Sequence, residues 1–275
     1  MEKPNYQKWK QLQSHWDDDD FLKSLTPLMK LRYRRLDEKV EAILGENFRE
    51  SGADKGRPFL LDLGAGRGEF AFFLHKQGRE KIWNYLGLEP SAEQLKQRDI
   101  PSFGLGFAQG VAEQVPLQDM TAHGVVVKEV IDHCFDPSKV FNEARRLLKP
   151  GGVLVVSVTN DKSYFKRLLP FVNHSHKAKQ TDHLFFFGPD ELRKLAQEAK
   201  FDRVEVQTYN YLKLPRIFER LITLLGDSMS RGLLNLADSI GNALLPGMGG
   251  GILLKAITKN DESSKKTANT KTLRH

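Results

Sequence analysis

The stretch Leu61-Asp62-Leu63-Gly64-Ala65-Gly66-Arg67-Gly68 decides the fold. It begins in the short apolar run Phe59-Leu60-Leu61 and leads into Glu69–His75, a segment with a helical pattern, so the order is strand, loop and helix. Glycine in such a loop allows positive φ and lets backbone N–H groups approach a ligand without a Cβ in the way. The pattern therefore predicts a nucleotide-type binding loop at the end of a strand.

The spacing of the glycines distinguishes between cofactors. Glu69 stands where a dinucleotide fingerprint has its third glycine, and no Gly-Lys-Ser/Thr follows as a P-loop requires. Asp62 puts a carboxylate at the strand end, where it would repel a pyrophosphate and suits a cationic amino-acid ligand. Glu89, about twenty residues after the loop, can accept hydrogen bonds from both hydroxyls of a ribose.

The remaining chain alternates strands with helices, which predicts an α/β fold: a Rossmann-like, seven-stranded, mostly parallel sheet with helices on both faces. Asp190 is the expected N-cap of the helix that ends at Ala199. Further strands are expected at 82–88, near 103–107, at 124–127, 153–158, 203–209 and 252–258, and further helices from Ser91 and at 138–148.

The predicted organisation is a single enzyme domain with extensions, because 275 residues can bury one core of ordinary size. We expect an N-terminal helical extension (1–57), a main domain (58–258) and a disordered basic tail (259–275). Within the domain, 215–245 is an amphipathic helical insertion before the last strand, predicted to pack on the sheet or cover the active site as a lid. The insertion has no row of lysine and arginine opposite its apolar stripe, so peripheral membrane contact is the weaker alternative.

Four blocks in the right order resemble the class I methyltransferases that depend on S-adenosylmethionine, in particular their small-molecule type 11 group. The resemblance covers about Phe59–Tyr209. The blocks are the glycine-rich stretch above, Leu86-Gly87-Leu88-Glu89-Pro90-Ser91, Glu129-Val130-Ile131-Asp132-His133 with Asp136-Pro137, and Leu148-Lys149-Pro150-Gly151-Gly152-Val153-Leu154.

The resemblance implies that S-adenosylmethionine is the cofactor and assigns residues to it. Asp62 and the glycines would line the methionine part, Glu89 would hold the ribose, and Val111-Ala112-Glu113 would lie near the adenine. The family often has Asp or Asn at the position of Val111, which bonds the adenine amine. The full set of implied cofactor contacts is Asp62, Gly64, Ala65, Gly66, Gly68, Glu89, Pro90, Val111, Ala112, Glu113 and Lys128.

Two histidines are the candidates for catalysis. His133 follows the fourth strand on the ligand side of the sheet, where it could remove a proton from the acceptor or merely bond a neighbouring loop. His183 lies in a histidine and aromatic segment that also contains His174 and His176 and that lies over the substrate pocket in the family. The spacing of these histidines fits no strong zinc pattern, so no metal is expected.

The acceptor class follows from signatures that are missing. There is no Asn/Asp-Pro-Pro-Tyr/Phe block, Cys134 does not follow a proline in a nucleophile loop, and no nucleic-acid module is appended. These absences favour a small organic, sugar or lipid-like acceptor. The alternatives are a non-catalytic, S-adenosylmethionine-binding scaffold and, given the net charge of +7, an RNA methyltransferase.

The expected compartment is the cytoplasm. The single cysteine cannot form an internal disulfide, and the first thirty residues lack the apolar core of a signal peptide. The oligomeric state is not predicted.

Overall fold

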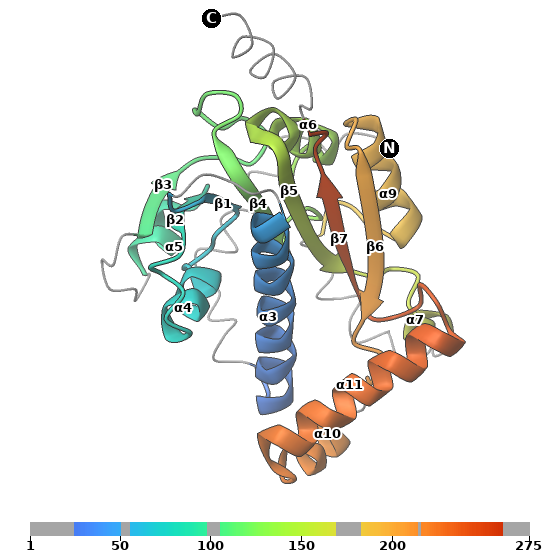
Figure 1. Cartoon of the computed structure of the whole chain (residues 1–275). Coiled ribbons are helices and arrows are strands. Elements are labelled where there is room, and N and C mark those ends of the chain that lie inside the picture. The colour runs from blue at the N-terminus through green and yellow to red at the C-terminus, as the bar shows by residue number, and fades with distance from the viewer. Residues whose placement is uncertain (1–24, 51–55, 98–104, 169–182, 214–215, 261–275) are drawn as a thin grey trace, which may run out of the picture.

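The computed structural model describes residues 25–50, 56–97, 105–168, 183–213 and 216–260. They form one seven-stranded sheet in the order β3-β2-β1-β4-β5-β7-β6 (Figure 1). Neighbouring strands are parallel except that β7 runs antiparallel to both β5 and β6. The strands are β1 (Phe59–Leu63), β2 (Asn84–Glu89), β3 (Leu105–Gln109), β4 (Ala122–Lys128), β5 (Leu148–Thr159), β6 (Arg203–Tyr209) and β7 (Gly251–Ile257). This confirms the predicted Rossmann-like sheet.

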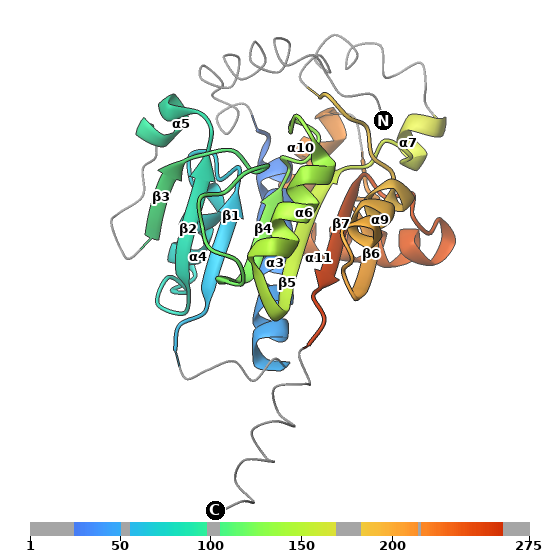
Figure 2. The same ribbon diagram turned by 90° about the horizontal axis from the view of Figure 1, so that it is seen from above.

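Helices cover both faces of the sheet (Figure 2). On one face α6 and α9 pack against β5, β6 and β7, and on the other α3 crosses β4 and β5 beside α4. The helices are α3 (Pro27–Glu50), α4 (Glu69–Lys76), α5 (Ala92–Lys96), α6 (Pro137–Leu147), α7 (Tyr164–Leu168), α9 (Pro189–Glu198), α10 (Arg216–Thr223) and α11 (Gly226–Leu244).

The strands bury both of their faces, so successive side chains enter two different cores. Leu61, Leu63 and Val125 belong to the core under α6 and α9, whereas Leu60 and Val126 belong to the core under α3 and α4. The period of two along each strand produces this division.

Helix α3 is the described part of the predicted N-terminal extension, and it is built into the α/β domain. Leu36, Val40 and Leu44 enter the core beneath it. Asp37 forms a 2.6 Å ion pair with Lys128 at the end of β4. The helix therefore places its own side chains beside the end of β4. Residues 1–24 lie outside the described part of the chain.

Two local predictions are wrong. Asp190 is not an N-cap: α9 begins after Gly188, with Pro189 in its first turn, and the Glu191 carboxylate accepts a hydrogen bond from the Gly188 N–H. Proline favours this first position because its missing N–H has no partner there in any case.

The second concerns the insertion, which forms α10 and α11 as expected but does not cover the sheet with its apolar stripe. The stripe faces outward, and its exposed members are Leu221, Leu225, Met229, Leu233, Leu236, Ile240 and Leu244.

The sheet has one switch point, between β1 and β4. From β1 the chain builds outward through β2 and β3, and then crosses to β4 on the other side of β1. Ligands of open α/β sheets bind at the carboxyl ends of the strands at such a point. The loops that follow β1, β2 and β4 are therefore the place to look for a site.

Candidate active site

The glycine loop after β1 uses its own N–H groups to fix its shape. Gly64 and Ala65 both donate to the carbonyl of Leu88, at 2.7 and 2.9 Å, and Gly68 donates to the carbonyl of Ala65. Gly66 donates to the Glu89 carboxylate at 2.9 Å. These four N–H groups are therefore not available to cradle a phosphate, in agreement with the spacing argument against a dinucleotide.

Gly64 combines a positive φ of 78° with close packing. A Cβ at this position would lie 2.5 Å from Cγ2 of Val130, in the loop after β4. We expect Gly64→Ala to lower the free energy of unfolding by about 2–4 kcal/mol, through backbone strain and this close contact, and so to lower the melting temperature.

The matched control is Gly78→Ala, which has a φ of 66° and nothing within 4 Å of the added Cβ. It carries the backbone strain alone, so thermal unfolding should show a clearly smaller shift than for Gly64→Ala. Equal shifts would contradict the close packing of the loop against Val130.

Three carboxylates give the loop a negative environment. Burial raises the pKa of Asp62 and of Glu89, and the nearby charge of Glu69 raises both further. Glu89 is buried, and its two oxygens accept from the N–H groups of Gly66 and Ser91. A carboxylate has about four acceptor positions, so Glu89 keeps capacity for ligand hydroxyls. The residues present thus fit a cationic nucleoside such as S-adenosylmethionine and disfavour a pyrophosphate.

Asp62 is buried within the domain rather than displayed in the loop. Its carboxylate accepts a 2.6 Å hydrogen bond from the hydroxyl of Tyr85, and burial raises the pKa of Asp62 to about 6. The side chain lies on the face of the sheet that α3 and α4 cover, the face of Tyr85 and Leu60. In this place Asp62 sets the local charge of the site as well as fixing Tyr85.

Two of the remaining predicted cofactor residues have protein partners. The Lys128 ammonium pairs with Asp37 and lies 5.3 Å from the centre of the Phe70 ring. Glu113 accepts from the N–H groups of Phe135 and Asp136, so it braces the loop after β4.

Three other predicted cofactor residues are held by backbone contacts or are buried. Val111 pairs with Gln114 in a short bridge, Ala112 is buried, and the Pro90 carbonyl accepts from the side chain of Gln109.

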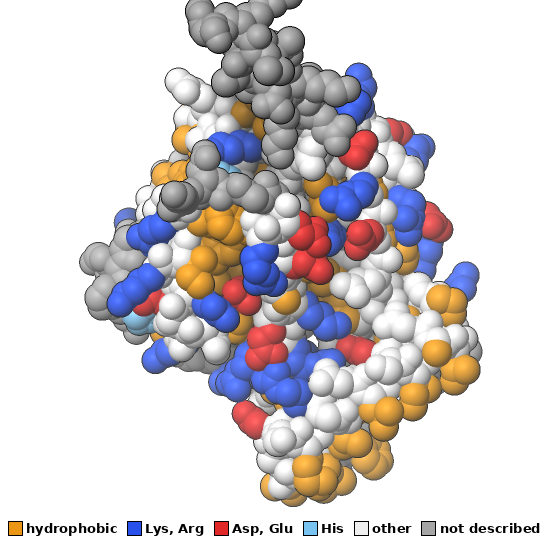
Figure 3. Space-filling model, viewed as in Figure 1, with side chains coloured by type: hydrophobic (Ala, Val, Ile, Leu, Met, Phe, Trp, Pro, Cys, Tyr) orange, Lys and Arg blue, Asp and Glu red, His pale blue; other side chains and the backbone are white. Residues whose placement is uncertain are grey.

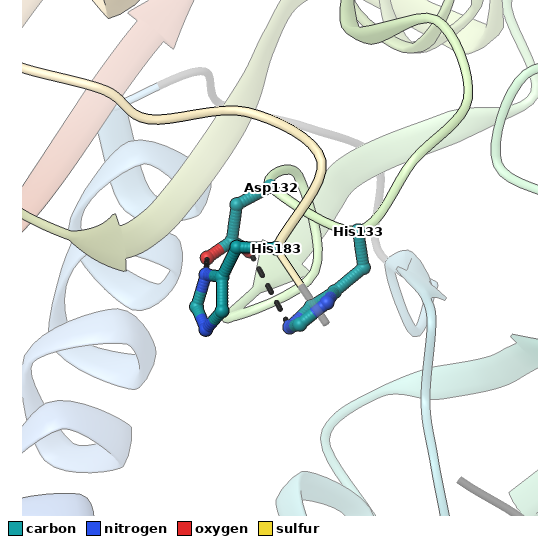
Figure 4. A group of neighbouring side chains, drawn as sticks. All are labelled: Asp132, His133 and His183. Carbon is teal, nitrogen blue, oxygen red and sulfur yellow. Dashed lines mark ion pairs between the residues drawn. The ribbon is translucent and has the colours of Figure 1, made fainter. Parts of the chain in front are cut away.

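The two predicted catalytic histidines come together on one buried carboxylate (Figure 4). Asp132 and His133 come from the loop after β4, and His183 from the segment before α9. His183 Nδ1 forms an ion pair with Asp132, and His133 Nε2 lies 3.7 Å from the other oxygen of the same carboxylate. The centres of the two imidazole rings are 4.6 Å apart.

The charges of Asp132, His133 and His183 influence one another. The hydrogen bond with Asp132 raises the pKa of His183. Burial opposes ionisation of Asp132, but the bond from His183 and the charge of His133 lower its pKa below the ordinary value. The pairing thus stabilises a carboxylate next to an imidazole that holds its proton more strongly than usual. The ligand atoms of the three residues lie within 4.8 Å of one another, so the group could also hold a metal ion.

Further polar residues around this group were missed by the sequence analysis. Glu129 has an unusual φ of 56° and accepts hydrogen bonds from Ser157 and Tyr209. Tyr33 of α3 is half-buried near the same carboxylates, and desolvation followed by the charges of Glu129 and Asp132 raises its pKa. The strained backbone of Glu129 is the kind of feature that clusters at functional sites.

Several other predicted residues are also placed. Phe185 and Phe187, the aromatic residues that follow His183, are buried in the core, and Cys134 is buried as a free thiol. His174 and His176 lie outside the described residues.

Comparison with known proteins bears on the family of this chain. The profile of a family described as "Methyltransferase domain" matches residues 61–156, from the glycine loop into β5. A ubiquinone biosynthesis O-methyltransferase of Aliivibrio fischeri is 25% identical over 208 residues, covering 71% of this chain and 81% of the relative. One of the same name from Cupriavidus pinatubonensis is 24% identical and covers 77% of this chain and 82% of the relative.

Solved structures agree with the fold. An S-adenosylmethionine-dependent methyltransferase of Thermotoga maritima, described as a possible histamine N-methyltransferase, superposes with a TM-score of 0.51 at 21% identity. The match covers 83% of this chain and 97% of that one. The glycine loop, the sheet order and these matches together support a class I S-adenosylmethionine-dependent methyltransferase, with the family match itself spanning residues 61–156.

Proposed function

We propose that this enzyme methylates a hydroxyl group on a small, partly apolar and aromatic acceptor, with His183 as the general base. The observation that carries the proposal is the pair formed by Asp132 and His183. A neutral amine can attack a methyl donor without losing a proton first, whereas a hydroxyl must give up its proton as the bond forms. A positioned base therefore favours an oxygen acceptor.

The geometry of the pair selects the atom that takes the proton. With Nδ1 donating to Asp132, the free lone pair of the His183 ring is on Nε2, which points away from the carboxylate in Figure 4. Asp132 holds the ring in this tautomer and stabilises the imidazolium that forms when the acceptor loses its proton. Asp132 is thus a positioning residue, and His183 the base.

The cofactor would be held by the glycine loop and by Glu89, with Asp62 and Glu69 supplying the negative environment. Bound S-adenosylmethionine supplies an electrophilic methyl group on a sulfonium. The protein's part is to hold the acceptor oxygen in line with that methyl, since contact and alignment give much of the rate of such a displacement. Val111, Ala112 and Glu113 stay the proposed neighbours of the adenine.

Aromatic side chains support the choice of acceptor. Phe186 is 52% exposed and stacks on the His183 ring, with ring centres 6.5 Å apart and planes 13° apart. Tyr209 donates a hydrogen bond to Glu129, and Tyr33 lies close enough to feel the charge of the same carboxylate. An aromatic ring carrying a hydroxyl could stack against Phe186 beside the base. The names of the relatives, ubiquinone biosynthesis O-methyltransferases, point to the same class of acceptor.

The test is transfer of labelled methyl to matched acceptors. Catechols and hydroquinones with alkyl tails of increasing length should be methylated on oxygen, as shown by mass spectrometry, and the corresponding anilines should react far more slowly. A parallel assay with a chelator, followed by added Mg²⁺ or Zn²⁺, shows whether a metal ion takes part. Faster reaction of the anilines would contradict the proposal. Binding of the cofactor with no turnover of any acceptor would favour a scaffold.

A further inference from the structure

Helices α10 and α11 expose a row of large apolar side chains on the outer margin of the molecule. We call Leu224, Met229, Leu233, Leu236, Ile240 and Leu244 the apolar ridge; they are between 39% and 80% exposed. Figure 3 shows hydrophobic side chains along this margin. Together they form an apolar surface on the order of several hundred Å², the size at which an exposed patch marks an interaction surface.

Polar contacts on the inner side of α11 fix this orientation. Asp238 is buried and forms a 2.9 Å ion pair with Arg35 of α3, and it also accepts from the N–H of Tyr211. Asn235 accepts from the Arg35 guanidinium at 2.7 Å. Breaking a buried pair by removing one partner costs several kcal/mol, so α11 cannot simply rotate to bury its leucines. The apolar side therefore stays outside.

Electrostatic attraction does not explain the ridge. From Leu221 to Pro246 the only exposed charged residue is Asp227, which pairs with Arg34. Apart from Asp227, the exposed positions between the ridge residues carry no charge, and several of them, such as Ser228, Gly232 and Ser239, are small. A surface of this kind binds by apolar insertion alone.

The ridge lies at the edge of the sheet where the active site opens. The α10 and α11 segment connects the end of β6 to the start of β7, which is the edge formed by the carboxyl ends of the parallel strands. Lys213, which lies between β6 and α10 along the chain, is acted on by the charges of both Glu129 of the site and Glu219 of α10. Glu219 is fixed by a 2.7 Å ion pair with Arg32 of α3.

We propose that the apolar ridge inserts into the surface of a lipid bilayer and holds the active-site edge against it. The part of this inference that has the bilayer deliver an apolar acceptor rests on the proposed function; the binding itself does not. A bilayer accepts a convex row of side chains without matching holes. A helical partner, including a second copy of this chain, needs holes that match the ridge residues and usually charged positions free to pair across the contact. The charges beside the ridge, Asp227 and Arg231, already pair with α3.

The experiment is flotation of the full chain with small vesicles of zwitterionic phosphatidylcholine, without cofactor or acceptor. We expect binding that is nearly the same at low and high salt. The double variant Leu236→Gln, Leu244→Gln should weaken partitioning at least about tenfold, because two leucines no longer insert. Gln is a good helix former, and both positions are exposed, so the fold should be retained.

The matched control is Met120→Gln, which replaces a 57% exposed apolar side chain just before β4, at the opposite edge of the sheet. It should bind vesicles like the unaltered chain. Turnover of a water-soluble acceptor should be unchanged in all three proteins, so loss of methyl transfer and loss of membrane binding are separate results.

Three outcomes would overturn the inference: no vesicle binding at all, binding that the double variant retains, or binding only to anionic vesicles that high salt abolishes. Light scattering adds the last comparison. If the unaltered chain is a dimer, the double variant is a monomer and neither binds vesicles, then the ridge is an interface between two copies.

Discussion

Replacing His183 with alanine should lower kcat by about two to four orders of magnitude, the usual contribution of a general base. The affinity for S-adenosylmethionine should stay within about twofold, because the imidazole lies in the histidine cluster and not among the carboxylates of the glycine loop. Steady-state kinetics at saturating cofactor measures the first quantity, and isothermal titration of the cofactor measures the second.

The pH profile separates a base from a structural residue. The base acts when neutral, and its pKa is raised by Asp132, so kcat should fall as the pH drops below that raised value. In Asp132→Asn the carboxylate charge is gone, so the pKa of His183 should fall and the acidic limb of the profile should move to lower pH. An isosteric amide keeps the packing, so a limb that does not move would contradict the assignment.

His133 provides the matched control, since it lies beside the same carboxylate but forms a longer contact of 3.7 Å. His133→Ala should cost much less in kcat than His183→Ala. If the large loss and the acidic limb both follow His133, then the base is His133 and the pairing of His183 with Asp132 is structural.

The sequence predicted the parts of the site that adjoin one another along the chain. The glycine loop and Glu89 follow from local patterns, because the spacing of apolar runs and glycines indicates which residues end a parallel strand. Tyr33 and the contact between Asp132 and His183 could not be found this way. Tyr33 reaches the site because α3 crosses the sheet, and His183 reaches Asp132 because a segment about fifty residues further along the chain returns to the end of β4. Local periodicity predicts neither of these long-range contacts.

The orientation of α11 was mispredicted for a related reason. An amphipathic pattern shows that a helix has an apolar side, and that side is normally buried. Here the inner side is instead set by Arg35, which lies about two hundred residues earlier and pairs with Asp238. The signal that was present is the placement of Asp238 and Asn235 on the side of the helix opposite to the leucines. This placement indicates the buried side of the helix only when the partner, Arg35, is known.

Replacing Glu89 with glutamine should weaken S-adenosylmethionine binding by about a hundredfold or more. Hydrogen bonds to a charged acceptor contribute about 1.5–3 kcal/mol each, and the proposed contact involves both ribose hydroxyls. Glutamine keeps the size of the side chain and one acceptor for the N–H groups of Gly66 or Ser91, which limits damage to the loop. Isothermal titration gives the affinity, and thermal unfolding without ligand checks the fold.

A second ligand decides whether the loss comes from the ribose contact. An S-adenosylmethionine analogue without the 2′ and 3′ hydroxyls should bind Glu89→Gln and the unaltered chain about equally well, because the interaction that the substitution removes is already absent. If Glu89→Gln weakens the two ligands equally, then Glu89 acts by holding Gly66 and Ser91, and the ribose is bound by another group.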